Sequence, residues 1–222
     1  MTDAYAKSRD RLIAQIERDV RDTRNFLGKD QLDPRVIEAL RRTPRHEFVE
    51  DARQRADAYE NRPLPIGHGQ TISQPYIVAI MTDMLQLTPE STVLEIGTGC
   101  GYQTAILAQL AARVYSVEIV AALAKSAKAR LARLGYRNVR VMQGDGRMGW
   151  APEAPYDAII ATAAARETPV GLRDQVRPGG RMVIPLGAPH MAQSLVRLDK
   201  DEDGHWSEHC HLPVAFVPMT AS

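Results

Sequence analysis

The chain has 222 residues, with 28 Lys and Arg against 27 Asp and Glu, so its formal net charge is +1. A charge this close to zero provides no long-range field that would attract a nucleic-acid backbone or an anionic membrane. Hydrophobic residues make up 44% of the sequence and charged residues 25%. This composition is typical of a folded globular protein and excludes a wholly disordered chain.

The cysteine content and the charge pattern indicate in which cellular compartment the protein is located. Cys100 and Cys210 are the only cysteines and lie far apart in the sequence, so they do not form a disulfide framework. The N-terminus is densely charged and lacks the apolar core of a signal peptide. No stretch approaches the ~20 apolar residues that span a bilayer. We therefore expect a cytoplasmic protein with no membrane partner.

Residues 1–60 are rich in charge and predict short amphipathic helices. The apolar residues at helical spacing near the start are Leu12, Ile13, Ile16 and Val20. Asp33-Pro34 and Thr43-Pro44 each have the pattern of an N-cap followed by proline in the first helical turn. The segment has too few large apolar residues to form its own core, so we expect it to pack on the rest of the chain.

Residues 61–75, NRPLPIGHGQTISQP, contain three prolines and two glycines. This composition predicts an irregular segment with no helix or strand. A helix is predicted to follow, from Gln74-Pro75 to Leu87, and Ser73 is a candidate N-cap for it.

From residue 91 the pattern alternates between strands and helices. The predicted strands are Thr92–Ile96, Val114–Glu118, Val139–Met142, Asp157–Ala161 and Met182–Leu186. The predicted helices are Tyr102–Ala111, Val120–Leu134 and Glu167–Val176. Such alternation predicts an α/β fold, a Rossmann-like, doubly wound parallel sheet with helices on both faces. Gln193–Leu198 and His211–Val217 flank a turn at 201–204 and predict an antiparallel hairpin at the sheet edge.

These elements predict a single domain over residues 1–222 that has four parts. Residues 1–60 form a helical extension, and residues 61–90 hold the substrate and active-site segment with its helix. Residues 91–190 form the cofactor-binding α/β core, and residues 191–222 form the C-terminal hairpin.

A glycine loop follows the first strand of the alternating region, in the run Val-Leu-Glu-Ile-Gly-Thr-Gly-Cys-Gly-Tyr at 93–102. Glycines let the backbone amides approach a ligand closely. Glu118 ends the next strand, where a carboxylate can accept hydrogen bonds from ribose hydroxyls. Asp145, within Gly144-Asp145-Gly146, ends the third strand and could accept a hydrogen bond from an adenine amine. Together they predict an adenosine ligand.

The spacing of the loop indicates which adenosine ligand it binds. The dinucleotide fingerprint is G-x-G-x-x-G, whereas this loop is G-x-G-x-G and has Tyr102 at the third glycine position. Glu95, just before the loop, is unfavourable beside a pyrophosphate and favourable beside the sulfonium and ammonium groups of S-adenosylmethionine. Both features favour S-adenosylmethionine over NAD.

Three segments together resemble one enzyme family. They are Pro63–Pro75 with its Gly-Gln-Thr-Ile-Ser-x-Pro motif, Leu94–Gly99, and Gly144–Gly146. The chain is similar to the protein-L-isoaspartate (D-aspartate) O-methyltransferase family, bacterial type, over about residues 30–219. The similarity includes Pro44-Arg45-x-x-Phe48-Val49 and Phe216–Pro218. It implies the class I S-adenosylmethionine-dependent methyltransferase fold.

The resemblance implies a repair activity. Members of the family transfer a methyl group from S-adenosylmethionine to the free α-carboxyl of L-isoaspartyl residues, and of some D-aspartyl residues, in damaged proteins and peptides. S-adenosylhomocysteine is the other product. The ester then collapses to a succinimide, which partly reopens to normal aspartate. The expected partners are therefore damaged proteins and peptides, with no nucleic acid, and the chain is expected to be a monomer.

The resemblance also implies roles for individual residues. Ser73 corresponds to the family's active-site serine. The implied cofactor-binding residues are Thr71, Ile72, Gly97, Thr98, Gly99, Tyr102, Glu118, Asp145 and Gly146. The implied substrate-binding residues are Ile66, His68, Thr71 and Ser73. Ala215 departs from many bacterial relatives, which have a basic residue there, and residues 1–29 lie outside the matched region and receive no role.

The chemistry is compatible with a serine in this position. A carboxylate has a reference pKa of about 4 and is already ionised at neutral pH, so the reaction does not need a strong general base. The enzyme mainly has to position and partly desolvate the attacking oxygen. We therefore expect Ser73 to orient the carboxylate and not to act as a covalent nucleophile.

Several alternatives remain beside this interpretation. One is a related methyltransferase that acts on aspartate in a dedicated peptide, and another is a non-catalytic protein that binds S-adenosylmethionine or isoaspartate. A nucleic-acid methyltransferase is less favoured, because the strand that ends near Thr162 lacks the acidic-or-amide Pro-Pro-aromatic motif. His205, His209, Cys210 and His211 have poor spacing for zinc ligands, so no metal is expected.

Overall fold

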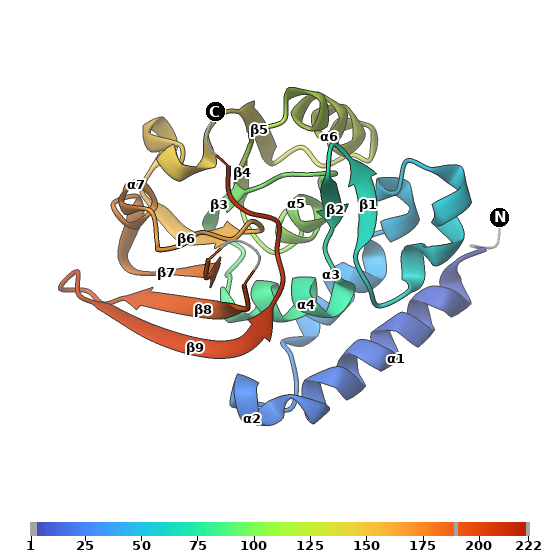
Figure 1. Ribbon diagram of the computed structural model, residues 1–222, viewed down its shortest axis with the longest axis horizontal. Coiled ribbons are helices and arrows are strands. Elements are labelled where there is room, and N and C mark those ends of the chain that lie inside the picture. The colour runs from blue at the N-terminus through green and yellow to red at the C-terminus, as the bar shows by residue number, and fades with distance from the viewer. Residues whose placement is uncertain (1–3, 189–190, 221–222) are drawn as a thin grey trace.

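The computed structural model describes residues 4–188 and 191–220, and its centre is a seven-stranded sheet (Figure 1). The strands of this sheet are β3 (Thr92–Ile96), β4 (Arg113–Glu118), β5 (Val139–Gln143), β6 (Tyr156–Ala161), β7 (Val176–Leu186), β8 (Gln193–Lys200) and β9 (Trp206–Val214). A separate two-stranded sheet consists of β1 (Leu64–Gly67) and β2 (Gln70–Ile72).

The α-helices lie before and between these strands. They are α1 (Ala6–Asp22), α2 (Arg24–Leu27), α3 (Pro34–Arg42), α4 (Pro75–Met84), α5 (Tyr102–Leu107), α6 (Ala121–Arg133) and α7 (Val170–Arg173). Short 3-10 helices add turns: η1 (Arg45–Phe48), η2 (Ala52–Tyr59), η3 (Gly146–Met148) and η4 (Ala151–Glu153). No helix within residues 4–188 and 191–220 is both long and apolar enough to cross a bilayer.

The strand order is β5-β4-β3-β6-β7-β8-β9. The first five are parallel to their neighbours, whereas β7, β8 and β9 pair antiparallel. This arrangement confirms the predicted α/β fold and the hairpin at the sheet edge. Because the carboxyl ends of parallel strands meet at one edge, the loops after β3, β4, β5 and β6 converge there.

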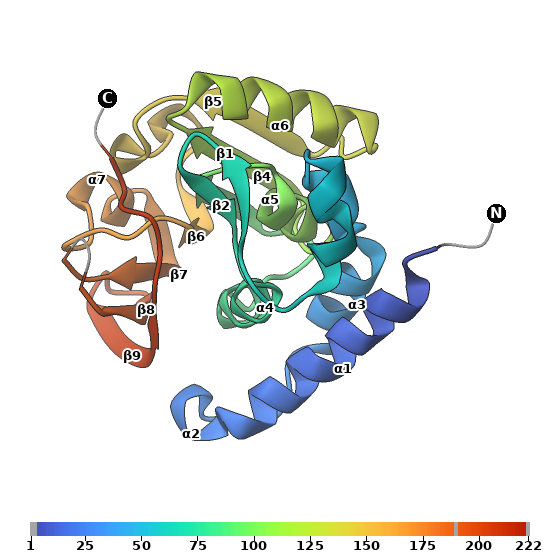
Figure 2. The same cartoon turned by 45° about the vertical axis from the view of Figure 1, so that its right-hand side comes forward.

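The two faces of the sheet are covered unequally (Figures 1 and 2). Helices α4, α5 and α6 cover one face, and α1 and α3 add to it from outside, so that buried residues of all five join one apolar cluster with the sheet. The other face packs against α7 and the loops around η3 and η4, where Tyr115 contacts the rings of Trp150 and Tyr156 edge-on.

The N-terminal helices follow the predicted pattern with one exception. The stripe from Leu12 to Val20 is buried on α1. Asp33 caps α3, since its side chain accepts a hydrogen bond from the Arg35 amide. Thr43 does not cap a helix: its hydroxyl donates back to the Ala39 carbonyl, and only a 3-10 turn follows.

The prediction that residues 61–75 are irregular is wrong. Leu64–Gly67 and Gln70–Ile72 form an antiparallel hairpin whose turn residues, His68 and Gly69, both have positive φ. Prolines are tolerated here because a two-stranded sheet consists of edges, where a missing N–H leaves no ladder bond unmade. The alternating burial along Leu64–Gly67 is the strand signal that the prolines concealed.

The bounds of several other helices and strands differ from the predicted ones. The predicted helix 167–176 shrinks to the four residues of α7, because the chain rejoins the sheet early, with the Tyr156 amide donating to the Gln175 carbonyl. The Arg177–Gly180 run, expected to precede a strand, lies inside β7, whose pairing with β6 shifts register there. Helix α4 ends at Met84, before the predicted Leu87.

Candidate active site

The glycine loop after β3 and Thr162, the residue after β6, are held against each other. Gly97 has φ of +93°, and a Cβ at this position would collide with the Thr162 hydroxyl. That hydroxyl donates to the Gly97 carbonyl at 2.7 Å and lies 3.1 Å from the Ile96 carbonyl. Glycine is therefore required at 97 by both conformation and space.

Glu118, the last residue of β4, is fixed at the same edge. Its carboxylate accepts hydrogen bonds from the Gly99 amide at 2.7 Å and from the Val120 amide at 2.9 Å. The side chain is only 5% exposed, yet it lines a pocket together with Gly97, Gly99 and Gly146. Each carboxylate oxygen has more than one lone pair, so Glu118 can still accept hydrogen bonds from a ligand's hydroxyls.

The loop after β5 forms the next wall of this pocket. A Cβ on Gly146 would collide with the Ile96 side chain, so glycine permits the close approach of the two loops. Asp145 is held by Arg147, whose Nε and Nη2 contact the two carboxylate oxygens at 3.0 and 2.5 Å. Gly146 lines the pocket directly, whereas Asp145 lies next to it in the chain.

The β1–β2 hairpin brings the second half of the site to the glycine loop. Thr71, Ile72 and Ser73 line a narrow cavity whose opposite wall is Gly97–Tyr102 and Thr162. We call this cavity the seam. It adjoins the pocket beside Glu118 and a groove that contains Ser73, and Thr71 and Thr162 line all three spaces.

The groove beyond the seam contains Ser73. Its lining residues are Pro63, Thr71, Ser73, Gln74, Ile77, Thr162 and Pro213–Val217, all of them uncharged. Its outer wall is held in place by Gln193, whose side-chain amide accepts a hydrogen bond from the Phe216 N–H at 2.7 Å and donates to the Phe216 carbonyl at 3.0 Å. The groove therefore provides a binding surface without charged side chains next to the seam.

Ser73 is not the N-cap of α4. Gln74 occupies that position, and no side chain caps the helix. Across the described ranges the Ser73 hydroxyl makes no hydrogen bond, while its carbonyl accepts one from Arg45 at 3.1 Å. A hydroxyl that is not used in capping is available to a ligand in the seam or the groove.

Two residues implied by the resemblance lie farther back. Ile66 is buried on β1 and packs toward Gly99 of the glycine loop, so it supports the seam from behind. His68 is exposed at the tip of the hairpin and lines neither the seam nor the groove. Its position follows from the turn, which requires positive φ at both central residues.

Glu95 does not face the ligand pocket, so the expectation of direct contact with the donor's positive groups is wrong. It is fully buried, and its Oε2 accepts hydrogen bonds from Thr104 at 2.5 Å and Ser116 at 2.7 Å. Ser116 in turn bonds Thr98 of the glycine loop at 2.5 Å. Burial raises the pKa of Glu95 to about 8. The residue supports the loop from beneath.

Thr162 is the site residue that sequence reasoning missed. In the sequence, the end of this strand was informative only because it lacks the motif of a nucleic-acid methyltransferase. A threonine directly after the fourth strand of a doubly wound sheet, opposite the first glycine loop, is the signal that could have identified it, because these two strands are neighbours across the switch point.

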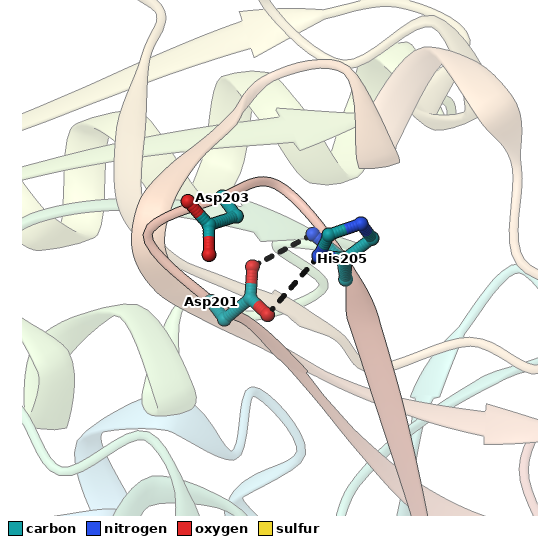
Figure 3. Close-up of side chains that lie close together, drawn as sticks. All are labelled: Asp201, Asp203 and His205. Atoms are coloured by element: carbon teal, nitrogen blue, oxygen red, sulfur yellow. Dashed lines mark hydrogen bonds and ion pairs between the residues drawn. The ribbon is translucent and has the colours of Figure 1, made fainter.

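The histidine-rich hairpin does not gather the residues considered for zinc. Cys210 approaches Glu208, His209 approaches Asp199, and His211 contacts the Phe26 carbonyl. His205 instead lies with Asp201 and Asp203 in the exposed β8–β9 turn (Figure 3). There Asp201 accepts a hydrogen bond from the His205 amide at 2.8 Å, as expected of an aspartate that closes a turn.

The sheet order, the glycine loop and the carboxylate after β4 define a class I methyltransferase. Residues 25–222 match the family described as Protein-L-isoaspartate(D-aspartate) O-methyltransferase (PCMT). The chain is 58% identical over 218 residues to Protein-L-isoaspartate O-methyltransferase 2 of Syntrophobacter fumaroxidans, covering 98% of this chain and 88% of the relative. It is 54% identical to the protein of the same name from Polaromonas, covering 94% and 99%.

Solved structures agree with this assignment. A protein-L-isoaspartate O-methyltransferase superposes with a TM-score of 0.83 at 26% identity, covering 96% of this chain and 66% of that one. A putative Plasmodium falciparum protein-L-isoaspartate O-methyltransferase, solved with S-adenosyl-L-homocysteine, superposes with a TM-score of 0.77 at 21% identity over the whole of both chains, which supports the fold. The chain belongs to the protein-L-isoaspartate (D-aspartate) O-methyltransferase family.

Proposed function

We propose that this enzyme transfers a methyl group from S-adenosylmethionine to the free α-carboxylate of L-isoaspartyl residues in damaged proteins and peptides. The observation that carries the proposal is the seam, where Ser73 and Thr71 of the hairpin face the glycine loop across one narrow space. The pocket beside Glu118 and an uncharged groove both adjoin it, through the shared residues Thr71 and Thr162. Group transfer between two bound molecules needs this arrangement.

The residues present fit the proposed cofactor. Gly97 and Gly146 let the loops after β3 and β5 pack against Thr162 and Ile96 at the edge of the pocket, and two backbone amides hold the Glu118 carboxylate there. We assign the ribose to Glu118 and the adenine side to Asp145 and Gly146. We assign the methionine part to Gly97, Thr98, Gly99 and Tyr102, with Thr71 and Ile72 between cofactor and peptide. When bound, S-adenosylmethionine supplies a methyl group made electrophilic by its sulfonium.

Ser73 has the orienting role in this proposal. Its hydroxyl donates a hydrogen bond to one oxygen of the isoaspartyl carboxylate and leaves the other oxygen free to attack. A neutral donor suits this task, since a paired cation would weaken the nucleophile. The absence of charged side chains from the groove lining helps in the same way, because attack neutralises the carboxylate and a poorly hydrated setting favours that change.

A matched pair of peptides tests the proposal. The chain is incubated with labelled S-adenosylmethionine and a peptide that contains either L-isoaspartyl or L-aspartyl at one position. We expect base-labile label on the isoaspartyl peptide alone. Label on neither peptide, with cofactor bound, would favour the non-catalytic binder, and label on the aspartyl peptide would favour an enzyme with a dedicated substrate. A third peptide with D-aspartyl tests the second activity in the family's description.

Replacing Ser73 tests its role. We expect Ser73→Ala to lower kcat about ten- to a hundredfold, because a misoriented carboxylate attacks less often. Affinity for S-adenosylhomocysteine should change little, since Ser73 does not line the pocket beside Glu118. An unchanged kcat would contradict the orienting role.

Three broader expectations also remain proposals. The small net charge supports an enzyme that acts without nucleic acid. Free thiols at Cys100 and Cys210 are compatible with the cytoplasm. Gel filtration with light scattering tests the expectation that the chain is a monomer.

A further inference from the structure

Arg45, the first residue of η1, is among the largest fully buried side chains, with 0% of its surface exposed. Within residues 4–188 and 191–220, no carboxylate pairs with it. Burying a charged group without an opposite charge is costly, so such a residue is retained only where its hydrogen bonds compensate. The partners of these hydrogen bonds therefore indicate what Arg45 holds together.

The guanidinium donates to three backbone carbonyls from three segments. Nη1 contacts the Ala58 carbonyl at 2.6 Å, near the end of η2. Nη2 contacts the Arg62 carbonyl, just before β1, at 3.1 Å, and the Ser73 carbonyl, just after β2, also at 3.1 Å. Arg45 therefore ties both ends of the β1–β2 hairpin to the N-terminal region.

The same guanidinium lies beside the cofactor side of the site. Its central carbon is 5.6 Å from the centre of the Tyr102 ring, and Tyr102 begins α5 directly after the glycine loop. Phe48, from the same 3-10 turn as Arg45, meets that ring edge-on at 5.5 Å. Arg45 is thus in contact with both walls of the seam, behind Ser73 on one side and under Tyr102 on the other.

We propose that Arg45 is a positioning residue for methyl transfer, which fixes the backbone of Ser73 relative to the glycine loop. This inference rests on the proposed function and extends it to a residue outside the seam. The planar guanidinium group of arginine has five N–H donors, so it can bond three carbonyls and stack on an aromatic ring at the same time. A lysine ammonium cannot hold this set in one geometry. Shifts of about 1 Å in a reacting group are enough to cost about a hundredfold in rate.

A double-mutant cycle separates positioning from general stability. Arg45→Lys, Ser73→Ala and the double variant are assayed with the isoaspartyl peptide at saturating substrate concentrations. We expect Arg45→Lys alone to lower kcat about tenfold or more. In the Ser73→Ala background the same change should have little further effect, because the hydroxyl that it positions is already gone. Affinity for S-adenosylhomocysteine should stay within about threefold of wild type, a smaller change than one good hydrogen bond produces.

Arg41→Lys is the matched control. Arg41 lies on α3, is about half exposed, and forms an ion pair with Glu38 of its own helix, at 3.9 Å. We expect wild-type kcat from this variant. The cycle is run at low temperature with saturating cofactor, which stabilises the folded state by mass action.

Three results would overturn the role of Arg45. They are a wild-type kcat in Arg45→Lys, additive losses in the double variant, and a variant that stays unfolded even at saturating cofactor concentration, which would assign Arg45 to the folding core alone. The proposed function fails in a different way: the wild-type chain itself would leave the isoaspartyl peptide unlabelled.

Discussion

Thr162 connects the two halves of the site through a single hydroxyl. It lines the cofactor pocket, the seam and the groove, and its proton is directed at the carbonyls of Ile96 and Gly97. Because that proton is committed to the loop, the oxygen's lone pairs remain for whatever occupies the seam. A single residue can therefore influence both the cofactor and the peptide.

Removing this hydroxyl should weaken catalysis without changing the packing. Thr162→Val has nearly the same shape, but it leaves the Gly97 carbonyl without its side-chain donor, at a cost of about 1–2 kcal/mol. We expect kcat/KM to fall about five- to thirtyfold, which corresponds to that free energy. Thr162→Ser, which keeps the hydroxyl, should recover most of the activity. Equal activity in the valine and serine variants would show that the hydroxyl has no role.

The β1–β2 hairpin is the element that places Thr71, Ile72 and Ser73. Its two-residue turn has positive φ at His68 and Gly69, the pattern of a type I′ turn, whose twist matches that of paired strands. Only the turn conformation makes glycine necessary at 69, because a Cβ there would meet no atom within 4 Å. The turn therefore sets where the hairpin presents its residues.

A pair of glycine substitutions tests this dependence. Gly69→Ala should cost about 1–2 kcal/mol of conformational strain and lower kcat/KM, because the hairpin that carries Ser73 is displaced or frayed. Gly204→Ala is the matched control. Gly204 lies in the β8–β9 turn, also with positive φ and open space, but away from the seam. We expect a similar drop in Tm from both variants and a loss of activity only from Gly69→Ala.

The sequence predicted the regular elements of the core well and the hairpin poorly. Strand β3 has the predicted bounds, and β4 and β6 differ by one residue, because short, largely apolar runs mark buried parallel strands clearly. The β1–β2 hairpin was missed because proline suppresses strand propensity in general, whereas its true effect depends on whether the strand lies at an edge.

The site was predictable where residues lie at the carboxyl ends of successive predicted strands. The glycine loop, Glu118 and Gly146 line one pocket as the strand order implied. Thr162 and Arg45 were not identified, since their importance comes from contacts with residues far away in the chain. Glu95 shows the opposite error: its place before the loop suggested a ligand contact, but β3 is buried along its whole length and the Glu95 side chain bonds Thr104 and Ser116 in the interior.

At the scale of the whole molecule, one apolar cluster extends from α1 and α3 through α4 and α5 to the sheet. We propose that the chain folds as a single unit, with the N-terminal extension as part of its core. Glu95 lies inside this unit, fully buried, with one carboxylate oxygen that has no hydrogen-bond partner in the described part of the chain. Its ionisation is therefore coupled to the stability of the whole fold.

That coupling has a definite sign. Burial raises the pKa of Glu95 from 4.5 in the unfolded chain to about 8 in the folded protein. Below pH 4.5 both states carry the proton, and the contribution of Glu95 to stability is fully present. As the pH rises toward about 8, the unfolded state loses the proton first, so it binds fewer protons than the folded state and the free energy of unfolding falls.

Urea unfolding of wild type and Glu95→Gln at a series of pH values tests this prediction. Glutamine keeps an oxygen for Thr104 and Ser116 but cannot ionise. We expect the wild-type free energy of unfolding to decrease relative to that of the variant between pH 5 and 8, while the m-values stay equal. The two proteins share every other titratable group, so the contributions of those groups cancel in the difference. Parallel curves for the two proteins would show that Glu95 has the same pKa in the folded and unfolded states.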